Sequence, residues 1–324
     1  MTADRRDYAQ EPPAMETPAV VFEAPERLRV RRVELNPPGD EDVVVQVDWS
    51  GISTGTERLL WTGQMPPFPG LGYPLVPGYE SVGRVVDAGS RARHRVGETV
   101  FVPGSSGFKT ARGLFGGAAR TLVTSAARAA TIPAGLAETG VLIALTATAR
   151  HAMAGGPAPD LIVGHGVLGR LLARLACASG APPLVWETNP ARRDGALGYS
   201  VIDPADDARR DYRAIYDVSG DSALLPELIS RLGRGGEIVL AGFYSQPLSF
   251  DFPPAFMREA RLRIAAEWTP QDLSATLEMI EAGRLSLANL ITHRAGVTAA
   301  DQAYRTAFQD PACLKLVLDW RADA

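Results

Sequence analysis

The chain has 324 residues, of which 46% are hydrophobic and 22% charged, a composition typical of globular proteins and a length sufficient for two domains. Its 33 basic and 37 acidic residues give a net charge of −4 without long runs of one sign, which argues against nucleic acid as a partner. No apolar stretch reaches the length of a membrane span and the amino terminus lacks the apolar core of a secretory signal, so we expect a cytoplasmic protein.

Residues 1–17 are expected to form a disordered tail, within which Met15 is an alternative start. From 18 to 138 the chain contains short, valine-rich runs separated by glycine and proline. This spacing predicts a β-rich domain with long loops. The apolar stretch at 139–154 predicts a helix that leads into the second half of the chain.

The segment LIVGHGVLG at 161–169 is the most informative in the chain, because an apolar run breaks into a G-x-G-x-x-G turn and continues as a helix-like stretch. That order predicts a strand, a phosphate-binding turn and a helix N-terminus. Gly164 permits the tight turn, Gly166 lets a pyrophosphate approach the backbone, and Gly169 lets the helix pack closely on the strand. The predicted cofactor site includes all six residues of the turn: Gly164, His165, Gly166, Val167, Leu168 and Gly169.

A second signal lies at the end of the next extended run, where Glu187 follows Gly169 by 18 residues. An acid there accepts hydrogen bonds from both ribose hydroxyls and repels a 2′-phosphate, so we expect NAD rather than NADP. Arg192 and Arg193 follow closely and are the main argument for NADP. Further cofactor contacts are expected just after strand ends, at Thr188, Asn189, Ser219, Gly220 and Gly242.

The pattern from 139 to 268 predicts an α/β Rossmann domain with a six-stranded, doubly wound parallel sheet. Its strands are expected at 160–166, 183–189, 200–203, 214–220, 236–243 and 261–266. The remaining segment, 269–324, offers two helices (270–283 and 298–309) and a terminal strand (314–320). Because six strands already complete the sheet, we expect this segment to return to the first domain.

This layout resembles the medium-chain dehydrogenase/reductase superfamily from about residue 18 to the end, on the motifs GISTGTE (51–57), VPGYE (76–80) and VGRVVDAG (82–89). Within it, SGISTGTERLLWTG (50–63) and DPACLKLVLDW (310–320) resemble the bacteriochlorophyll-synthesis dehydrogenases. The resemblance implies that 18–138 is a GroES-like catalytic domain. It also implies that NAD accepts a hydride as the 3-(1-hydroxyethyl) group of a bacteriochlorophyllide is oxidised to 3-acetyl.

The chain departs from the zinc-dependent members of that superfamily at the positions of their metal ligands. Ser53 stands where they carry a cysteine-containing turn, and Tyr79 where they carry a histidine. The two cysteines, Cys177 and Cys313, lie elsewhere, and no C-x-x-C spacing is present. We therefore expect a zinc-independent enzyme without metal ligands.

The two turns that replace the zinc site carry six candidates for proton chemistry: Ser53, Thr54, Thr56, Glu57, Tyr79 and Glu80. Tyr79 is expected to bond to the substrate oxygen, a glutamate to act as base or relay, and the small hydroxyls to carry the proton outward. Alternatives stay open for each residue. Tyr79 is also consistent with a pocket wall, Glu80 with an ion pair to an arginine, and Glu57 with the cap of a turn. The Ser/Thr cluster is also consistent with bonds to its own backbone.

Aromatic, proline-rich loops at 59–80 and 101–117 suit a broad, flat, apolar ligand such as a tetrapyrrole, or they cover the domain core or a subunit contact. The candidate pocket residues are Trp61, Phe68, Tyr73, Phe108 and Lys109, the lysine for a propionate group. The alternative functions are a zinc-independent quinone or enal reductase and a non-catalytic pigment-binding protein. The superfamily resemblance implies a homodimer through the sheet edge at 261–266, and a poorly soluble substrate is compatible with peripheral membrane contact.

Overall fold

A computed structural model describes residues 14–321, so most of the expected tail at 1–17 lies outside the described residues. Glu16 and Thr17 already belong to the first strand, because they pair with Glu34 and Val33 of the second. The ordered chain thus begins earlier than expected. Within 14–321, no helix is both long and apolar enough to cross a membrane.

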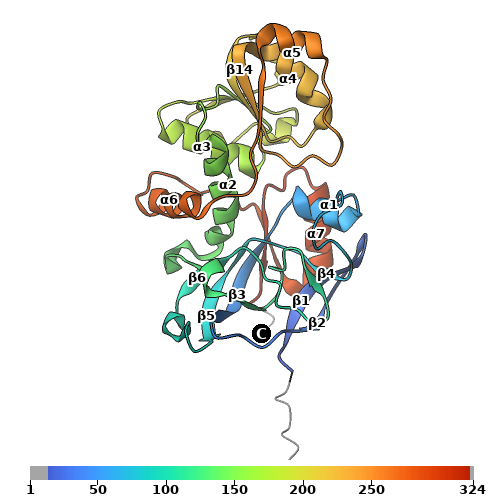
Figure 1. Ribbon diagram of the computed structural model, residues 1–324, viewed down its shortest axis with the longest axis vertical. Coiled ribbons are helices and arrows are strands. Elements are labelled where there is room, and N and C mark those ends of the chain that lie inside the picture. Colours follow the sequence, from blue (N-terminus) through green and yellow to red (C-terminus); the bar gives the residue numbers. More distant parts are fainter. Residues whose placement is uncertain (1–13, 322–324) are drawn as a thin grey trace, which may run out of the picture.

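Two sheets form the first domain, in the lower part of Figure 1. The four-stranded sheet has the order β2-β1-β4-β7, and the seven-stranded sheet has the order β16-β17-β3-β5-β6-β9, with β8 paired to β3. The strands are β1 (Glu16–Ala24), β2 (Arg27–Glu34), β3 (Asp42–Ile52), β4 (Leu75–Val76), β5 (Ser81–Ala88), β6 (Thr99–Val102), β7 (Arg112–Gly113), β8 (Thr121–Ser125), β9 (Ala130–Thr131), β16 (His293–Gly296) and β17 (Leu316–Asp319). The last two come from the end of the chain, where β17 lies antiparallel to β3.

One helix, α1 (Thr56–Thr62), interrupts this β-rich domain in a segment that we expected to be a loop. Leu60 and Trp61 are buried on its inner face, so the helix is stabilised by packing against the domain core. Gly63, in the left-handed conformation with φ of 72°, ends it.

The second domain confirms the predicted six-stranded sheet, with all strands parallel and in the order β12-β11-β10-β13-β14-β15. The strands are β10 (Leu161–Val163), β11 (Leu184–Trp186), β12 (Ser200–Ile202), β13 (Tyr212–Asp217), β14 (Leu232–Leu240) and β15 (Arg261–Ile264). The helices that follow α1 are α2 (Ile143–Met153), α3 (Val167–Ala178), α4 (Leu225–Arg231), α5 (Phe252–Arg258), α6 (Pro270–Glu281) and α7 (Ala300–Gln309).

Successive residues of the central strand belong to two hydrophobic cores, one on each face of the sheet. Ile162 packs with α2 and α3, whereas Leu161 and Val163 pack with α4. Burial on both faces explains why the parallel strands read as uninterrupted apolar runs. The strands end earlier than predicted, because the chain leaves the sheet in tight turns such as the one at Gly164, whose φ is 104°.

Candidate active site

Ser53 and Tyr79 meet because the chain segments that carry them are neighbours in one sheet. Strand β3 pairs antiparallel with β5, which places Ser50 opposite Ser81. Ser53 follows the end of β3 and Tyr79 precedes the start of β5, and their hydroxyl oxygens lie 2.7 Å apart. This distance is that of an O–H···O hydrogen bond. Thr54 and Thr56 are half-buried in the same turn.

Glu57 is fully buried behind this hydroxyl pair. Its Oε1 accepts a hydrogen bond of 3.0 Å from the backbone N–H of Ser53. Its Oε2 accepts one of 2.9 Å from the hydroxyl of Tyr304, on α7. Burial, with a further contribution from the charge of Glu80, raises the pKa of Glu57 to about 8. The carboxyl group therefore holds the Ser53 turn against α7.

Glu80 forms an ion pair with Lys315, and both side chains are almost completely removed from solvent. The Lys315 ammonium lies 2.8 Å and 2.7 Å from the two carboxylate oxygens, and 3.1 Å from the carbonyl oxygen of Ile52. Burial raises the pKa of Glu80, and the ammonium opposes that rise. The alternative of an ion pair was correct, but the partner is a lysine rather than an arginine.

Burial, the charge of Glu80 and the charge of Glu57 raise the pKa of Tyr79 well above its ordinary value. The phenol is therefore protonated at neutral pH and acts through hydrogen bonds. Its ring lies perpendicular to that of Phe115, with 5.6 Å between the ring centroids. Phe68 in turn packs edge-on against Phe115 at 6.1 Å, so an aromatic wall continues from the hydroxyl pair.

The other residues proposed for the substrate pocket lie in different surroundings. Trp61 and Phe108 are 6% and 7% exposed and belong to the core of the first domain, where Trp61 packs against Phe308 of α7. We therefore assign both side chains to packing, because nearly all of their surface is buried in the core. The hydroxyl of Tyr73 donates to the carbonyl of Leu60 and fixes its loop to α1, while Lys109 is exposed.

The glycine turn joins β10 to α3. A Cβ atom at Gly169 would lie 1.9 Å from the carbonyl oxygen of Gly164, so only glycine allows the helix to approach the strand this closely. A Cβ atom at Gly166 would meet nothing within 4 Å, which leaves open space above this part of the backbone. That space is on the side where a pyrophosphate is expected.

Loops after neighbouring strands come together at this turn. A Cβ atom at Gly164 would lie 3.4 Å from the backbone nitrogen of Ser219, and one at Gly242 would lie 3.2 Å from that of Gly220. Asp217, at the end of β13, accepts hydrogen bonds from both the amide and the hydroxyl of Ser219. The carboxyl edge of the sheet thus gathers the residues predicted from separate strand ends.

Glu187 is held at the glycine turn by backbone N–H groups. It accepts hydrogen bonds of 3.1 Å from His165 and 2.8 Å from Asn189. The imidazole of His165 turns inward, where its Nδ1 lies 2.6 Å from the carbonyl of Arg192 and its Nε2 lies 2.8 Å from the hydroxyl of Tyr199. Nδ1 must donate to the carbonyl, so Nε2 accepts from Tyr199. Burial lowers the pKa of His165 to about 4, and only its backbone faces the turn.

The two arginines that argued for NADP are engaged elsewhere. Arg193 donates to the carbonyls of Glu187 and Thr188 and pairs with Asp203. Arg192 donates to the carbonyls of Pro311 and Cys313, in the segment before β17. Arg192 is thus directed to the returning segment. Arg193 lies beside the Glu187 loop, but its charge is paired with Asp203.

The hydroxyl pair and the glycine turn border the same hydrophobic core. Tyr79 packs against the core cluster that joins Val82 of the first domain to Ile162 of the second. Leu168, in the first turn of α3, and Val218, after β13, pack against that cluster too. The two predicted half-sites therefore border one continuous core, although 85 residues separate Tyr79 from Gly164.

The alcohol dehydrogenase GroES-like domain family matches residues 39–134. The 2-desacetyl-2-hydroxyethyl bacteriochlorophyllide A dehydrogenase of Cereibacter sphaeroides is 59% identical over 318 residues, which cover 96% of this chain and 100% of the relative. The enzyme of the same name from Rhodobacter capsulatus is 58% identical over 311 residues, covering 95% and 99%. This chain belongs to that dehydrogenase family.

The superfamily and the GroES-like fold expected from the motifs are thereby confirmed. The structure of the acetophenone reductase from Geotrichum candidum, in complex with NAD, has a TM-score of 0.83 and covers 97% of this chain and 100% of its own. At 18% identity it shows a shared fold alone.

Two residues of this dehydrogenase that matter at the site, Lys315 and Tyr304, were not among the sequence candidates, whereas Phe115 lies in the aromatic loop 101–117 that was. The sequence holds one indication of Lys315, because a lysine inside the apolar run CLKLVLDW is unusual. A lysine that is buried in such a run needs an acidic partner. Within residues 14–321, no three His, Cys, Asp or Glu side chains are placed to hold a metal ion together.

Proposed function

We propose that this dehydrogenase oxidises the hydroxyethyl group of a bacteriochlorophyllide to an acetyl group, with NAD as cofactor. The names of the two relatives support the reaction, since they match this chain over almost its whole length. The observation that carries the proposal is the hydroxyl pair of Ser53 and Tyr79 beside the rings of Phe115 and Phe68. A hydrogen-bonding pair next to an aromatic wall suits an alcohol carried on an apolar macrocycle.

The hydroxyl pair moves the proton of the substrate alcohol in this proposal. Tyr79 Oη accepts the proton from the substrate oxygen while it donates its own to Ser53 Oγ. Ser53 in turn releases its hydroxyl proton through Thr54 and Thr56 to solvent, so each hydroxyl ends the step with one proton. Glu57 and Glu80 hold the two turns in place, because their oxygens already accept from Ser53, Tyr304 and Lys315. This assignment replaces the expectation that a glutamate is the base.

NAD, when bound, supplies the acceptor for the hydride that leaves the carbinol carbon. The residues proposed to hold it are those of the glycine turn (164–169), Glu187 to Asn189 for the ribose, and the loops at Ser219, Gly220 and Gly242. The contacts of Arg192 and Arg193 support NAD over NADP. The macrocycle itself helps to stabilise the transition state, because positive charge that develops at the carbinol carbon spreads into the conjugated ring. The protein therefore has less of this charge to stabilise.

We also propose that the reaction is zinc-independent. Catalytic zinc prefers cysteine, histidine and carboxylate ligands. The groups in the corresponding place are the hydroxyls of Ser53 and Tyr79 and the lysine-paired Glu80, and they already bond to one another or to Lys315. A serine–tyrosine pair does not match that ligand set.

The test is an absorption assay of metal-analysed protein with 3-hydroxyethyl bacteriochlorophyllide and either NAD or NADP. We expect a red-shifted acetyl product and an equal amount of NADH, with NAD strongly preferred, and a loss of about 100-fold in kcat for Tyr79→Phe. Pigment binding without turnover would instead indicate a pigment-binding protein. Preference for NADPH with quinones or enals would indicate a reductase, and stoichiometric zinc in active protein would contradict zinc independence.

We propose a cytoplasmic location, since Cys177 and Cys313 are both free thiols, as is usual in a reducing compartment.

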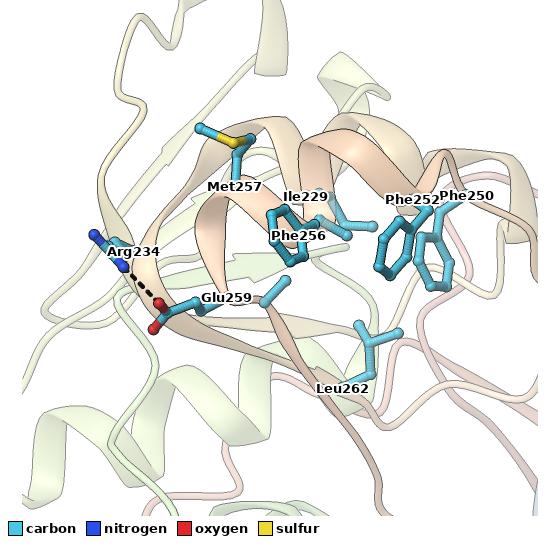
Figure 2. Close-up of a pocket in the computed structure, with 10 residues that line it drawn as sticks. Ile229, Arg234, Phe250, Phe252, Phe256, Met257, Glu259 and Leu262 are labelled. Carbon is cyan, nitrogen blue, oxygen red and sulfur yellow. Dashed lines mark hydrogen bonds and ion pairs between the residues drawn. The ribbon is translucent and has the colours of Figure 1, made fainter.

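We further propose a homodimer formed through the edge of the parallel sheet. Figure 2 shows Phe250, Phe252, Phe256 and Leu262 around one hollow, between α5 and β15. Phe256 is 64% exposed, and Ile264 on the outer strand β15 is 77% exposed. An edge strand with an apolar face is a template for pairing with a second copy. Peripheral membrane contact is the competing use of the same surface.

A further inference from the structure

Lys315 is unusual in this chain, because almost all the other basic residues are arginines. The sequence contains two lysines, Lys109 and Lys315, among its 33 basic residues. Lys315 is the buried one, at 1% exposure, and it precedes β17 in the returning segment. Its three ammonium hydrogens match three oxygens: two of the Glu80 carboxylate and the carbonyl of Ile52.

These three oxygens come from the two turns that carry the hydroxyl pair. Ile52 directly precedes Ser53, and Glu80 directly follows Tyr79. We propose that Lys315 is a positioning residue for the oxidation, whose ammonium clips the Ile52 carbonyl to the Glu80 carboxylate and thereby fixes the distance between Ser53 Oγ and Tyr79 Oη. Lys315 acts through these neighbours and contacts neither the substrate nor the cofactor in this role.

The backbone around the clip is shaped to admit the carboxylate. A Cβ atom at Gly51 would lie 2.1 Å from Oε2 of Glu80, so no other residue at this position leaves the ion pair undisturbed. The amide of Gly51 also donates to the carbonyl of Glu80, at 2.8 Å. Strand β3 is therefore joined to the Tyr79 segment by both its backbone and the Lys315 ammonium.

Stability alone does not account for this arrangement. Taking an ammonium and a carboxylate out of water carries a large free-energy cost, and well-packed apolar residues of similar volume often stabilise a fold equally well or better. What a buried ion pair provides is a fixed geometry, since either partner left alone carries a large penalty. Fixed geometry is what a pair of hydroxyls must have to move a proton within hydrogen-bonding distance.

The test compares wild type with Lys315→Met and with the double variant Glu80→Gln/Lys315→Met. We expect Lys315→Met to lose about 100-fold in kcat, the scale of a displacement near 1 Å, with KM for substrate changed less than about threefold. Arg294→Met is the matched control, because it breaks an exposed ion pair with Glu138 in the same returning segment and leaves kcat unchanged.

The double variant separates positioning from folding, because it removes the buried charge together with the clip. We expect its melting temperature to return close to that of wild type while kcat stays low, and hydrogen exchange to rise in peptides covering 50–58 and 76–82. A double variant with wild-type kcat and wild-type exchange would overturn the proposal and leave the ion pair a purely structural feature.

The kinetic part of this inference rests on the proposed function, whereas the exchange measurement does not. If wild type fails to oxidise the bacteriochlorophyllide, the proposed function fails. Unchanged exchange in the 50–58 and 76–82 peptides of the double variant then still overturns the clip, and raised exchange supports it.

Discussion

Glu57 is a carboxyl group whose protonation departs far from its ordinary behaviour in water. Its side chain is completely buried, and burial raises its pKa from 4.5 to about 8. The sequence marked Glu57 as a candidate base because of its place in the G-T-E turn. Its second hydrogen bond comes from Tyr304, 247 residues later, a partner that no local pattern reveals.

A raised carboxyl pKa makes the folded state less stable as the pH rises. Well below pH 4.5 the group is protonated in both the folded and the unfolded state, so it does not change the free energy of unfolding with pH. Between about pH 4.5 and 8 the unfolded chain loses the proton while the folded protein keeps it, and stability falls by about 1.4 kcal/mol per pH unit. We expect urea unfolding at pH 5 to 8 to show this decline in wild type and a flatter one in Glu57→Gln.

Glu278→Gln is the matched control for this measurement, because Glu278 is exposed on α6. It is expected to follow wild type over the whole range. A Glu57→Gln variant whose stability declines as steeply as that of wild type would show that Glu57 is already ionised in the folded protein.

At the scale of elements, the turn between β10 and α3 is the part that the sequence predicted most completely. Its three glycines act over a span of a few residues, so their spacing alone carries the geometry. The structure adds that they do different work. Gly169 is required by the fold itself, whereas Gly166 borders open space with ordinary extended backbone, φ of −73°.

Gly166→Ala is therefore expected to fold like wild type but to bind NADH about tenfold more weakly or worse, because the new methyl group stands where the pyrophosphate approaches. Gly169→Ala is expected to lose about 1–3 kcal/mol of stability in the absence of cofactor. Thermal unfolding and fluorescence titration with NADH measure the two effects. Gly135→Ala is the control, since a Cβ there meets nothing within 4 Å and no nucleotide contact is expected. Wild-type affinity in Gly166→Ala would place the pyrophosphate elsewhere.

For the whole molecule, the returning segment is the feature that unites the two halves. It adds β16 and β17 to the first domain and supplies Tyr304 and Lys315 to the carboxylates, and its carbonyls accept hydrogen bonds from Arg192 of the nucleotide domain. In Figure 1 this segment, coloured orange to red, runs from α6 to α7. We expected this segment to return because six strands already complete the sheet. That reasoning did not predict which residues of the first domain it would contact.

The exposed apolar face of α5 and β15 leads us to predict the oligomeric state of the protein. We expect light scattering to give the mass of a dimer for wild type and of a monomer for Ile264→Glu, because a charge on the edge strand opposes sheet pairing. Val96→Glu, at an exposed apolar residue of the first domain, is expected to stay dimeric. A monomeric wild type that binds lipid vesicles through this face would contradict the dimer and assign the surface to a membrane.

The sequence by itself determined the nucleotide fold, the glycine turn, the acid at the end of the next strand and the two turns with Ser53 and Tyr79, because these depend on periodicity and on spacings of a few residues. Only the tertiary structure decided what the side chains contact. Lys315 reaches Glu80 across 235 residues, and Trp61 and Phe108 enter the core instead of a pocket wall. Such pairings depend on how sheets and helices pack in three dimensions. The identity of a lysine or a tryptophan in the sequence does not reveal whether its side chain contacts a carboxylate, the core or a ligand.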